Sequence, residues 1–500
     1  MISTICLYKQ SLALLTDLYQ MTMSYGYWKQ GLDKQEAVFH LFFRRPAFHG
    51  GFTVAAGLES VIDYLNRFQF DQSDLDYLAT LTTSTGEQLF SNEFFDYLSN
   101  LKFTCDIDAV PEGTVVFPYQ PLVRVKGPLI QCQILESPLL NLINFSSLIA
   151  TKAARIATAA KGESVIEFGL RRAQGIDGAL TASRSAYIGG CDSTSNILAG
   201  KLFGIPVKGT HSHSWVMVFE DELESFQKYA ESMPDNCIFL VDTYDTIEGV
   251  KKAIQVGKWL KKKGKKLLGI RLDSGDLTYL SNKSRELLDA AGFQDALIVA
   301  SNELDETVIS ELKRQGAQIN VWGVGTHLVT GKDHPSLDGV YKLSAIRDLG
   351  GEWKYKLKLS EQMLKVSNPG ILQVKRFYNA RENLADAIYD IDHIPMEDWT
   401  LIDPFDSTLQ KVLKPGVQSR DLLQPIFRDG KCVYELPTLE QIRDATKREL
   451  DCFNMGVKRF LNPHRYFAGM EKGVHDMKMQ IIHSIRNQTS NSLISPEDNA

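Results

Sequence analysis

The stretch Ile-Pro-Val-Lys-Gly-Thr-His-Ser-His-Ser, residues 205–214, joins a short apolar run to a turn rich in hydroxyl and imidazole groups. The apolar run stops at Gly209, and His211 and His213 follow so closely that only a tight turn fits between them. Parallel α/β enzymes build their active sites at the carboxyl ends of strands, from residues placed in this way. The stretch therefore predicts an α/β enzyme with this turn in its site.

The segments around this stretch alternate between β-branched apolar runs and amphipathic helical runs. In the second half of the region the spacing is roughly 25–30 residues, which is the size of a βα unit. About eight such strands in order would close an (α/β) barrel, and the uneven first repeats predict an irregular one. We expect the strands at 164–168, 186–188, 205–207, 237–241, 267–271, 296–300, 319–324 and 339–343.

The two flanks of the chain lack this regular alternation. We expect four parts: an N-terminal α+β domain at 1–135, an α/β barrel catalytic domain at 136–344, return segments at 345–437 that pack on the N-terminal domain, and a C-terminal helical extension at 438–500. The N-terminal domain is thus expected to be completed by C-terminal segments.

Composition is that of an ordinary globular protein, with 44% hydrophobic and 23% charged residues. A net charge of −6 with mixed signs gives no reason to expect nucleic acid or an anionic membrane as a partner. The seven cysteines form no C-x-x-C motif, so neither a zinc knuckle nor a disulfide framework is indicated. Without a signal peptide pattern or a long uncharged apolar segment, we expect a cytoplasmic protein.

Polar residues, one aromatic residue and several glycines follow the carboxyl ends of the expected strands. In strand order these residues are Phe168 and Arg171, Gly189 and Gly190, Thr210 and His213, Asp242, Arg271 and Asp273, Ser301 and Asn302, and Gly325 and Thr326. Because the carboxyl ends of parallel strands meet at one face, we expect these side chains to lie together.

Single motifs leave alternatives open. Gly325-Thr326 fits either a plain strand-to-helix turn or a nest of backbone N–H groups for a phosphate. Arg271 and Asp273 fit either an Asx turn with a structural ion pair or an anion site beside a ribose-binding carboxylate. The pair His211 and His213 also allows a metal-dependent hydrolase, although arginines at the same mouth would repel a divalent cation and suit an anion.

Six motifs, taken in order, are similar to those of one family. They lie at 15–21, 167–175, 209–214, 271–276, 300–305 and 324–326. With these motifs the chain resembles the nicotinate phosphoribosyltransferases, of the type II phosphoribosyltransferase fold, from about Leu14 to its end. The resemblance implies an ATP-coupled, ligase-type enzyme that joins nicotinate to phosphoribosyl diphosphate (PRPP). The products are nicotinate mononucleotide and diphosphate, a step of NAD biosynthesis from nicotinate.

The resemblance also implies roles for individual residues. Phe168 and Tyr19 would stack on the pyridine ring, with Tyr19 supplied by the other subunit of a homodimer whose active sites lie at the subunit interface. Arg171, Thr210 and Arg271 would surround the carboxylate. Ser195 stands where the related nicotinamide-using enzymes carry an aspartate, and a serine can donate to an acid.

His213 matches the phosphorylated histidine of the family, and His211 falls at a variable position. With Asp273 as the second catalytic residue, the remaining implied positions bind PRPP: Asp242, Arg271, Ser301, Asn302, Gly325 and Thr326. ATP and Mg²⁺ are the implied cofactors, and the Mg²⁺ would be carried by the diphosphate. A relative that binds the base without catalysis is the third alternative, but both His213 and Asp273 are present.

Overall fold

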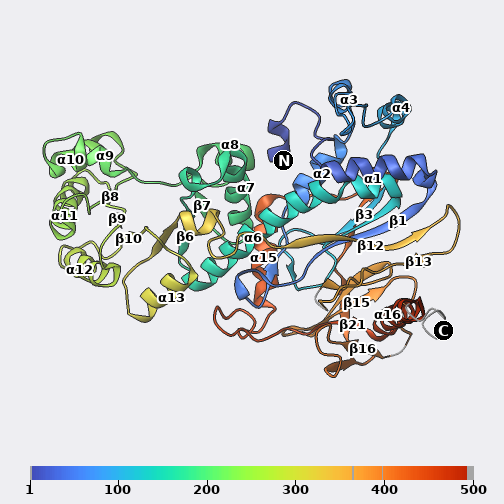
Figure 1. Ribbon diagram of the computed structural model, residues 1–500. Helices are drawn as coiled ribbons and strands as arrows, with labels where there is room; N and C mark the ends of the chain where they lie inside the picture. The colour runs from blue at the N-terminus through green and yellow to red at the C-terminus, as the bar shows by residue number, and fades with distance from the viewer. Residues whose placement is uncertain (1–2, 363–364, 397, 493–500) are drawn as a thin grey trace, which may run out of the picture. The chain divides into compact units, whose positions relative to one another are not determined.

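A computed structural model describes residues 3–362, 365–396 and 398–492 (Figure 1). The described chain divides into two compact units. The first contains Ile149–Pro335 and Leu439–Arg443, and the second contains the other described residues. The four-part division expected from the sequence stays a prediction, because compactness alone does not show which segments fold independently.

The first unit is built on a six-stranded parallel sheet in the order β7-β6-β11-β10-β9-β8. A single parallel bridge between Thr194 and Val207 continues the pairing beyond β7. In chain order the strands are β6 (Ser164–Glu167), β7 (Ser193–Thr194), β8 (Ile238–Leu240), β9 (Gly269–Leu272), β10 (Leu297–Ala300) and β11 (Val321–Val324). The sheet is a half-barrel, as expected of an irregular barrel.

Helices connect these strands, and aspartates fix where four of the helices begin. Asp221, Asp245, Asp276 and Asp305 each accept a hydrogen bond from a backbone N–H in the first turn of the helix that follows. These helices are α10 (Glu222–Ser232), α11 (Thr246–Lys262), α12 (Leu277–Ala290) and α13 (Glu306–Arg314). Figure 1 shows α11 and α12 beside β8–β10. The helices expected between the strands are therefore confirmed.

Two of the expected barrel strands are wrong, and a third, at 205–207, is reduced to the single bridge at Val207. Residues 186–188 form the buried last turn of α7 (Gly175–Ile188), because a short apolar run cannot distinguish a buried helix from a strand. Residues 339–343 do form a strand, within β12 (Gly339–Arg347), but it pairs antiparallel with β1 (Glu36–Phe43) in the second unit. The parallel sheet therefore has fewer strands than a closed barrel, and Gly189 and Gly190 follow a helix.

The second unit contains two large sheets that mix early and late parts of the chain. One has the order β13-β12-β1-β5-β3-β19-β20 and the other the order β17-β16-β21-β15-β14-β18. In the first of them β1 lies between β5 (Val123–Pro128) and β12, while β3 (Asp106–Ala109) pairs with β19 (Gln424–Arg428). Later segments therefore complete the N-terminal α+β fold, as predicted.

The remaining strands of the second unit are β2 (Thr53–Val54), β4 (Val115–Val116), β13 (Lys354–Tyr355), β14 (Leu372–Tyr378), β15 (Asn383–Asp390), β16 (Trp399–Ile402), β17 (Gln410–Leu413), β18 (Gln418–Asp421), β20 (Lys431–Cys432) and β21 (Ala468–Glu471). Its longer helices include α1 (Leu18–Lys29), α2 (Leu58–Asn66) and α16 (Lys472–Ser492), and α15 (Leu439–Asp451) begins in the first unit.

One helical segment is long and apolar enough to cross a membrane by length and composition. It runs from Leu129 to Ala160 and contains α5 (Leu129–Ile134) and α6 (Glu136–Ala160). Within its most apolar window, 61% of the residues are buried inside the protein. That burial is typical of a core helix of a globular protein, which can be equally long and apolar.

Candidate active site

The parallel sheet brings most of the predicted site residues to one edge. Twelve predicted residues belong to the first unit, at or just beyond the carboxyl ends of its strands or in the loops that follow: Phe168, Arg171, Ser195, Thr210, His213, Asp242, Arg271, Asp273, Ser301, Asn302, Gly325 and Thr326. Tyr19 lies on α1 in the second unit, where its side chain is 49% exposed.

Arg271, near the end of β9, is the centre of the hydrogen bonding at this edge. Its guanidinium donates from Nε to Ser301 Oγ at 2.8 Å and from Nη1 to Thr210 Oγ1 at 3.1 Å. Nη2 pairs with Asp273 Oδ1 at 2.8 Å. Arg271 is only 9% exposed, so these contacts fix its orientation. One cation thus connects the ends of β9 and β10 and the loop before α9 (His213–Met217).

Asp273 is held ionised by its surroundings. Burial alone would raise its pKa, but hydrogen bonds from Ser301 and Arg271 and the guanidinium charge hold the pKa below the ordinary value. Its backbone N–H donates to Asp242 Oδ2 at 3.0 Å, and the Ser274 hydroxyl donates to the same oxygen at 2.6 Å. The other oxygen of Asp242, Oδ1, is buried and has no hydrogen-bond partner in the structure. A buried acceptor left in this way suits a ligand hydroxyl or a cation.

His213 lies against Asp273. Its Nε2 is 3.7 Å from Asp273 Oδ2, and its Nδ1 is 3.1 Å from Thr243 Oγ1. The side chain is 39% exposed, so the imidazole is oriented by protein groups and still open to solvent. Sequence reasoning missed Thr243, although it directly follows the predicted Asp242.

His211 has a different environment, which argues against the alternative in which it binds a metal together with His213. Its Nε2 accepts a hydrogen bond from the backbone N–H of Leu240 at 3.3 Å, and its ring lies 5.0 Å from that of Tyr229. Burial lowers the pKa of His211 to about 4, and the charges of Arg271 and His213 act in the same direction. Because the Nε2 lone pair is used within the protein, His211 is not free to bind a metal. Among the described residues no group of three His, Cys, Asp or Glu side chains could hold one.

Phe168 forms an apolar floor beside Arg271. The Arg271 guanidinium carbon is 5.4 Å from the centre of the Phe168 ring. Gly323 in β11 lies against the same ring, where an added Cβ would come within 2.7 Å of two ring carbons. Glycine is therefore needed at this position for the aromatic ring to fit. Arg171, in the short 3₁₀ helix Leu170–Arg172, is exposed.

Two further loops complete the edge. Asn302, after β10, has a φ of 96°, a left-handed conformation that a non-glycine residue adopts at a cost. Gly325 follows β11 and directly precedes α14 (Thr326–Val329). The backbone strain at Asn302 lies next to Ser301, which contacts both Arg271 and Asp273.

Glu167, the last residue of β6, is a polar residue of this edge that sequence reasoning missed. It is 1% exposed and accepts hydrogen bonds from Gly169 N, Ser183 Oγ and Thr194 Oγ1. A carboxylate that ends a buried apolar strand is the signal that identifies such a residue, because it needs partners.

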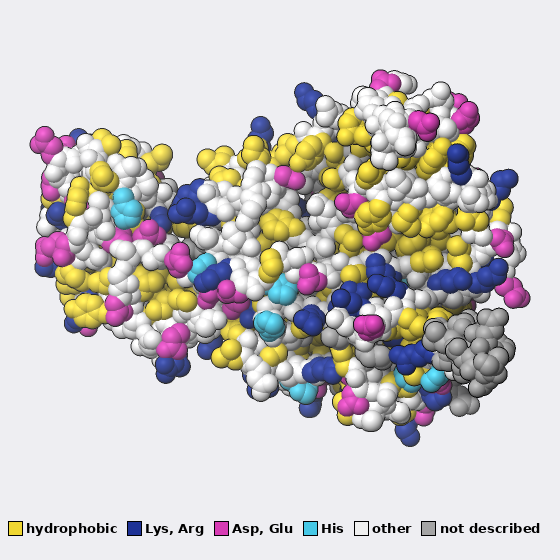
Figure 2. Space-filling view, viewed as in Figure 1, with side chains coloured by type: hydrophobic (Ala, Val, Ile, Leu, Met, Phe, Trp, Pro, Cys, Tyr) yellow, Lys and Arg dark blue, Asp and Glu magenta, His cyan; other side chains and the backbone are white. Residues whose placement is uncertain are grey.

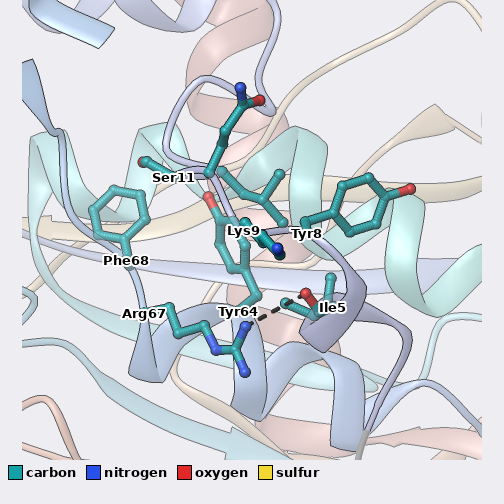
Figure 3. Close-up of a pocket in the computed structure, with 9 residues that line it drawn as sticks. Ile5, Tyr8, Lys9, Ser11, Tyr64, Arg67 and Phe68 are labelled. Atoms are coloured by element: carbon teal, nitrogen blue, oxygen red, sulfur yellow. Dashed lines mark hydrogen bonds between the residues drawn. The ribbon is translucent and has the colours of Figure 1, made fainter. Parts of the chain in front are cut away.

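The cavity in Figure 3 lies elsewhere, in the second unit between the N-terminal segment and α2. Its volume is about 170 Å³, and Arg67 donates to the Ile5 carbonyl at its wall at 3.4 Å. A second cavity of the same unit, of about 310 Å³, is lined by Phe117, Phe405 and Tyr466 among others. Neither cavity is lined by a predicted site residue. The candidate active site is therefore placed at the strand ends, where the predicted residues lie together.

Three family models match the chain in succession. They are the nicotinate phosphoribosyltransferase (NAPRTase) N-terminal domain at residues 14–144, the nicotinate phosphoribosyltransferase (NAPRTase) family at 164–352, and the nicotinate phosphoribosyltransferase C-terminal domain at 372–478. Together they span the strand-end site and both flanks.

Individual relatives agree with the family models over nearly the full length. Nicotinate phosphoribosyltransferase of Bacillus subtilis (strain 168) is 41% identical over 490 residues, which cover 97% of this chain and 98% of the relative. The Caenorhabditis elegans enzyme of the same name is 36% identical over 94% of this chain and 93% of its own. The crystal structure of human nicotinic acid phosphoribosyltransferase matches with a TM-score of 0.80 at 31% identity, covering 93% and 99% of the two chains. The predicted fold class is confirmed, and the chain belongs to the nicotinate phosphoribosyltransferase family.

Proposed function

We propose that this protein joins nicotinate to PRPP, forming nicotinate mononucleotide and diphosphate, in the salvage of nicotinate for NAD. In this reaction the pyridine nitrogen forms a bond to C1 of the ribose while the bond from C1 to the diphosphate oxygen breaks. The observation that carries the proposal is the arrangement of Arg271, Asp273, Ser301 and Thr210 at one sheet edge, with His213 beside Asp273. A fixed cation and carboxylates at one edge suit an anionic base and a ribose phosphate.

The base is assigned to the apolar floor of the site. The Phe168 ring would stack on the pyridine, and Tyr19 of a second subunit would cover the other face. Arg171, Thr210 and Arg271 would bind the carboxylate, and the Ser195 hydroxyl would donate to it. A serine in place of an aspartate favours the acid over the amide, because an aspartate would repel a carboxylate.

PRPP is assigned to the loops that follow β8, β9, β10 and β11. Asp242 and Asp273 would bind the ribose hydroxyls, with Arg271, Ser301 and Asn302 beside them. Gly325 and Thr326 would bind the 5′-phosphate through backbone N–H groups before α14. The unpartnered Oδ1 of Asp242 suits a Mg²⁺ ion carried by the diphosphate, which uses few protein ligands and supplies charge neutralisation when bound.

We propose that ATP enters the reaction through His213. Transfer of the γ-phosphoryl group to an imidazole nitrogen breaks its bond to ADP and yields a phosphohistidine, which water later hydrolyses. The added negative charge next to Asp273 would change the electrostatics of the diphosphate site. The contacts to Thr243 and Asp273 would orient the imidazole for this transfer.

We propose a cytoplasmic homodimer with each active site completed by Tyr19 of the other subunit. Lys and Arg side chains are interspersed with Asp and Glu over the face shown in Figure 2, which supports small-molecule substrates and no nucleic-acid partner.

The test compares wild type with His213→Ala, using γ-labelled ATP and an assay for nicotinate mononucleotide. We expect ATP-stimulated product and an acid-labile, base-stable label on wild type only. Product without label would remove the role of His213 and keep the transferase. Absence of product from nicotinate and PRPP, with or without ATP, would contradict the proposed function itself.

A further inference from the structure

Glu167 ties together the two segments on which recognition of nicotinate would depend. It ends β6, directly before Phe168, and one of its carboxylate oxygens accepts the Gly169 N–H of the following turn. That turn leads to the 3₁₀ helix that carries Arg171. The other oxygen accepts from Ser183 Oγ in α7 at 2.8 Å and from Thr194 Oγ1 in β7 at 2.5 Å. One buried side chain thus connects two strands and a helix.

Ser195 is bracketed by this network. Its own backbone N–H donates to the carbonyl oxygen of Glu167 at 2.9 Å. On one side, Thr194 donates its hydroxyl to the Glu167 carboxylate and accepts from the Asn196 N–H at 3.0 Å. On the other side, the Asn196 amide donates to Ser183 Oγ at 3.3 Å. The position of Ser195 is therefore set by hydrogen bonds that converge on Glu167.

The orientation of these hydrogen bonds depends on a carboxylate. Thr194 donates its one proton to Glu167 and is then available as an acceptor for the Asn196 N–H. The Ser183 hydroxyl has the Glu167 carboxylate at 2.8 Å and the Ala179 carbonyl at 3.0 Å as acceptors, and it accepts from the Asn196 amide. An amide at position 167 would present an NH₂ group to one of its three donors and so break the network at one point. A half-satisfied buried network is costly, because the unpaired group is kept from water.

We infer that Glu167 is a positioning residue for nicotinate: through Gly169 and Thr194 it sets the distance between the Phe168–Arg171 turn and Ser195, and thereby the preference for the acid over the amide. The inference rests on the proposed transfer to nicotinate. Glu167 touches none of the reacting atoms in this account. Its effect should therefore appear in the binding of the base and leave the binding of PRPP largely unchanged.

The test is Glu167→Gln, with Glu163→Gln as the matched control. Glu163 lies just before the other end of the same strand, where it accepts from Trp322 Nε1 at 2.7 Å. In Glu167→Gln we expect the KM for nicotinate to rise about tenfold and the kcat/KM ratio of nicotinate to nicotinamide to fall by a similar factor. The KM for PRPP should stay within about twofold, and Glu163→Gln should change neither KM.

Thr194→Val gives a second variant in case Glu167→Gln does not fold. It removes the hydroxyl on the Ser195 side alone, so it should lower the same selectivity ratio by a smaller factor. An unchanged nicotinate KM and ratio in a folded variant, or equal rises in both KM values, would overturn the inference. Nicotinate binding by calorimetry needs no turnover, and weaker binding to Glu167→Gln than to wild type is expected there too. An inactive wild type would thus count against the proposed function alone.

Discussion

The two edges of the parallel sheet in the first unit hold polar groups in opposite ways. At the amino edge Glu163 accepts from Trp322 Nε1 at 2.7 Å and pairs with Lys313 at 2.6 Å. Asn320 accepts the Ile298 N–H at 3.1 Å. These groups find their partners within the fold, and the contacts join strand to strand and strand to helix. The amino edge therefore serves stability.

At the carboxyl edge some polar groups have no partner within the protein or remain open to solvent. Asp242 Oδ1 is buried without a hydrogen-bond partner, and His213 is 39% exposed beside Asp273. Asn302 adopts a left-handed backbone conformation. Unused acceptors and strained backbone cost stability, and such features concentrate where a ligand compensates for them. One sheet therefore separates its stabilising and its functional residues by edge, as parallel barrels do.

The largest expected effect follows from removing the cation at the carboxyl edge. Arg271→Ala leaves Asp273 without its ion pair and Thr210 and Ser301 without their donor. Loss of a fixed donor that stabilises the charge developing on the substrates costs about 4 kcal/mol of transition-state stabilisation, so kcat/KM should fall by about 10³. Steady-state kinetics measures this, with Arg285→Ala as control, because Arg285 pairs with Asp289 on α12. A loss of activity in the control of equal size would show that the effect is one of folding.

A smaller effect is expected on the pH dependence of stability, through the buried His211. The unfolded chain binds a proton at His211 as the pH falls through its ordinary value of about 6.5, whereas the folded chain does so only near a pKa of about 4. Between these pH values the unfolded state binds more protons, so stability is present above pH 6.5 and is lost as the pH falls, by about 3 kcal/mol at most. His211→Gln keeps an acceptor for the Leu240 N–H, and its stability should depend less on pH. Urea denaturation at a series of pH values measures the difference. Identical slopes for both proteins would contradict the buried, neutral His211.

The smallest expected effect is at the amino edge. Glu163→Gln weakens the pair with Lys313 and should lower the free energy of unfolding by about 1 kcal/mol. Because this group is far along the strand from the site residues, kcat and both KM values should stay unchanged. Chemical denaturation and the transferase assay check the two halves of this statement. A loss of activity without a loss of stability would contradict the claim that the amino edge serves stability and not catalysis.

Strand ends were predictable because apolar runs that stop at polar residues mark them. Phe168, Asp242, Ser301 and Gly325 were placed correctly in this way, since carboxyl ends of parallel strands share an edge. The strand β7 was missed because its two residues are too short to show a period. The sequence pattern also left open whether His211 was a ligand, because burial against Tyr229 is a tertiary property. The position of Glu167 in an apolar strand was a signal in the sequence, but its partners Ser183 and Thr194 were not predictable because they come from distant parts of the chain.

The proposed transfer is tested most directly by the release of diphosphate from labelled PRPP by wild type, measured with and without nicotinate. We expect release that depends on nicotinate, with one diphosphate formed for each nicotinate mononucleotide. Release that proceeds equally without nicotinate, or no release at all, would contradict the assignment of the carboxyl edge to transfer of the phosphoribosyl group.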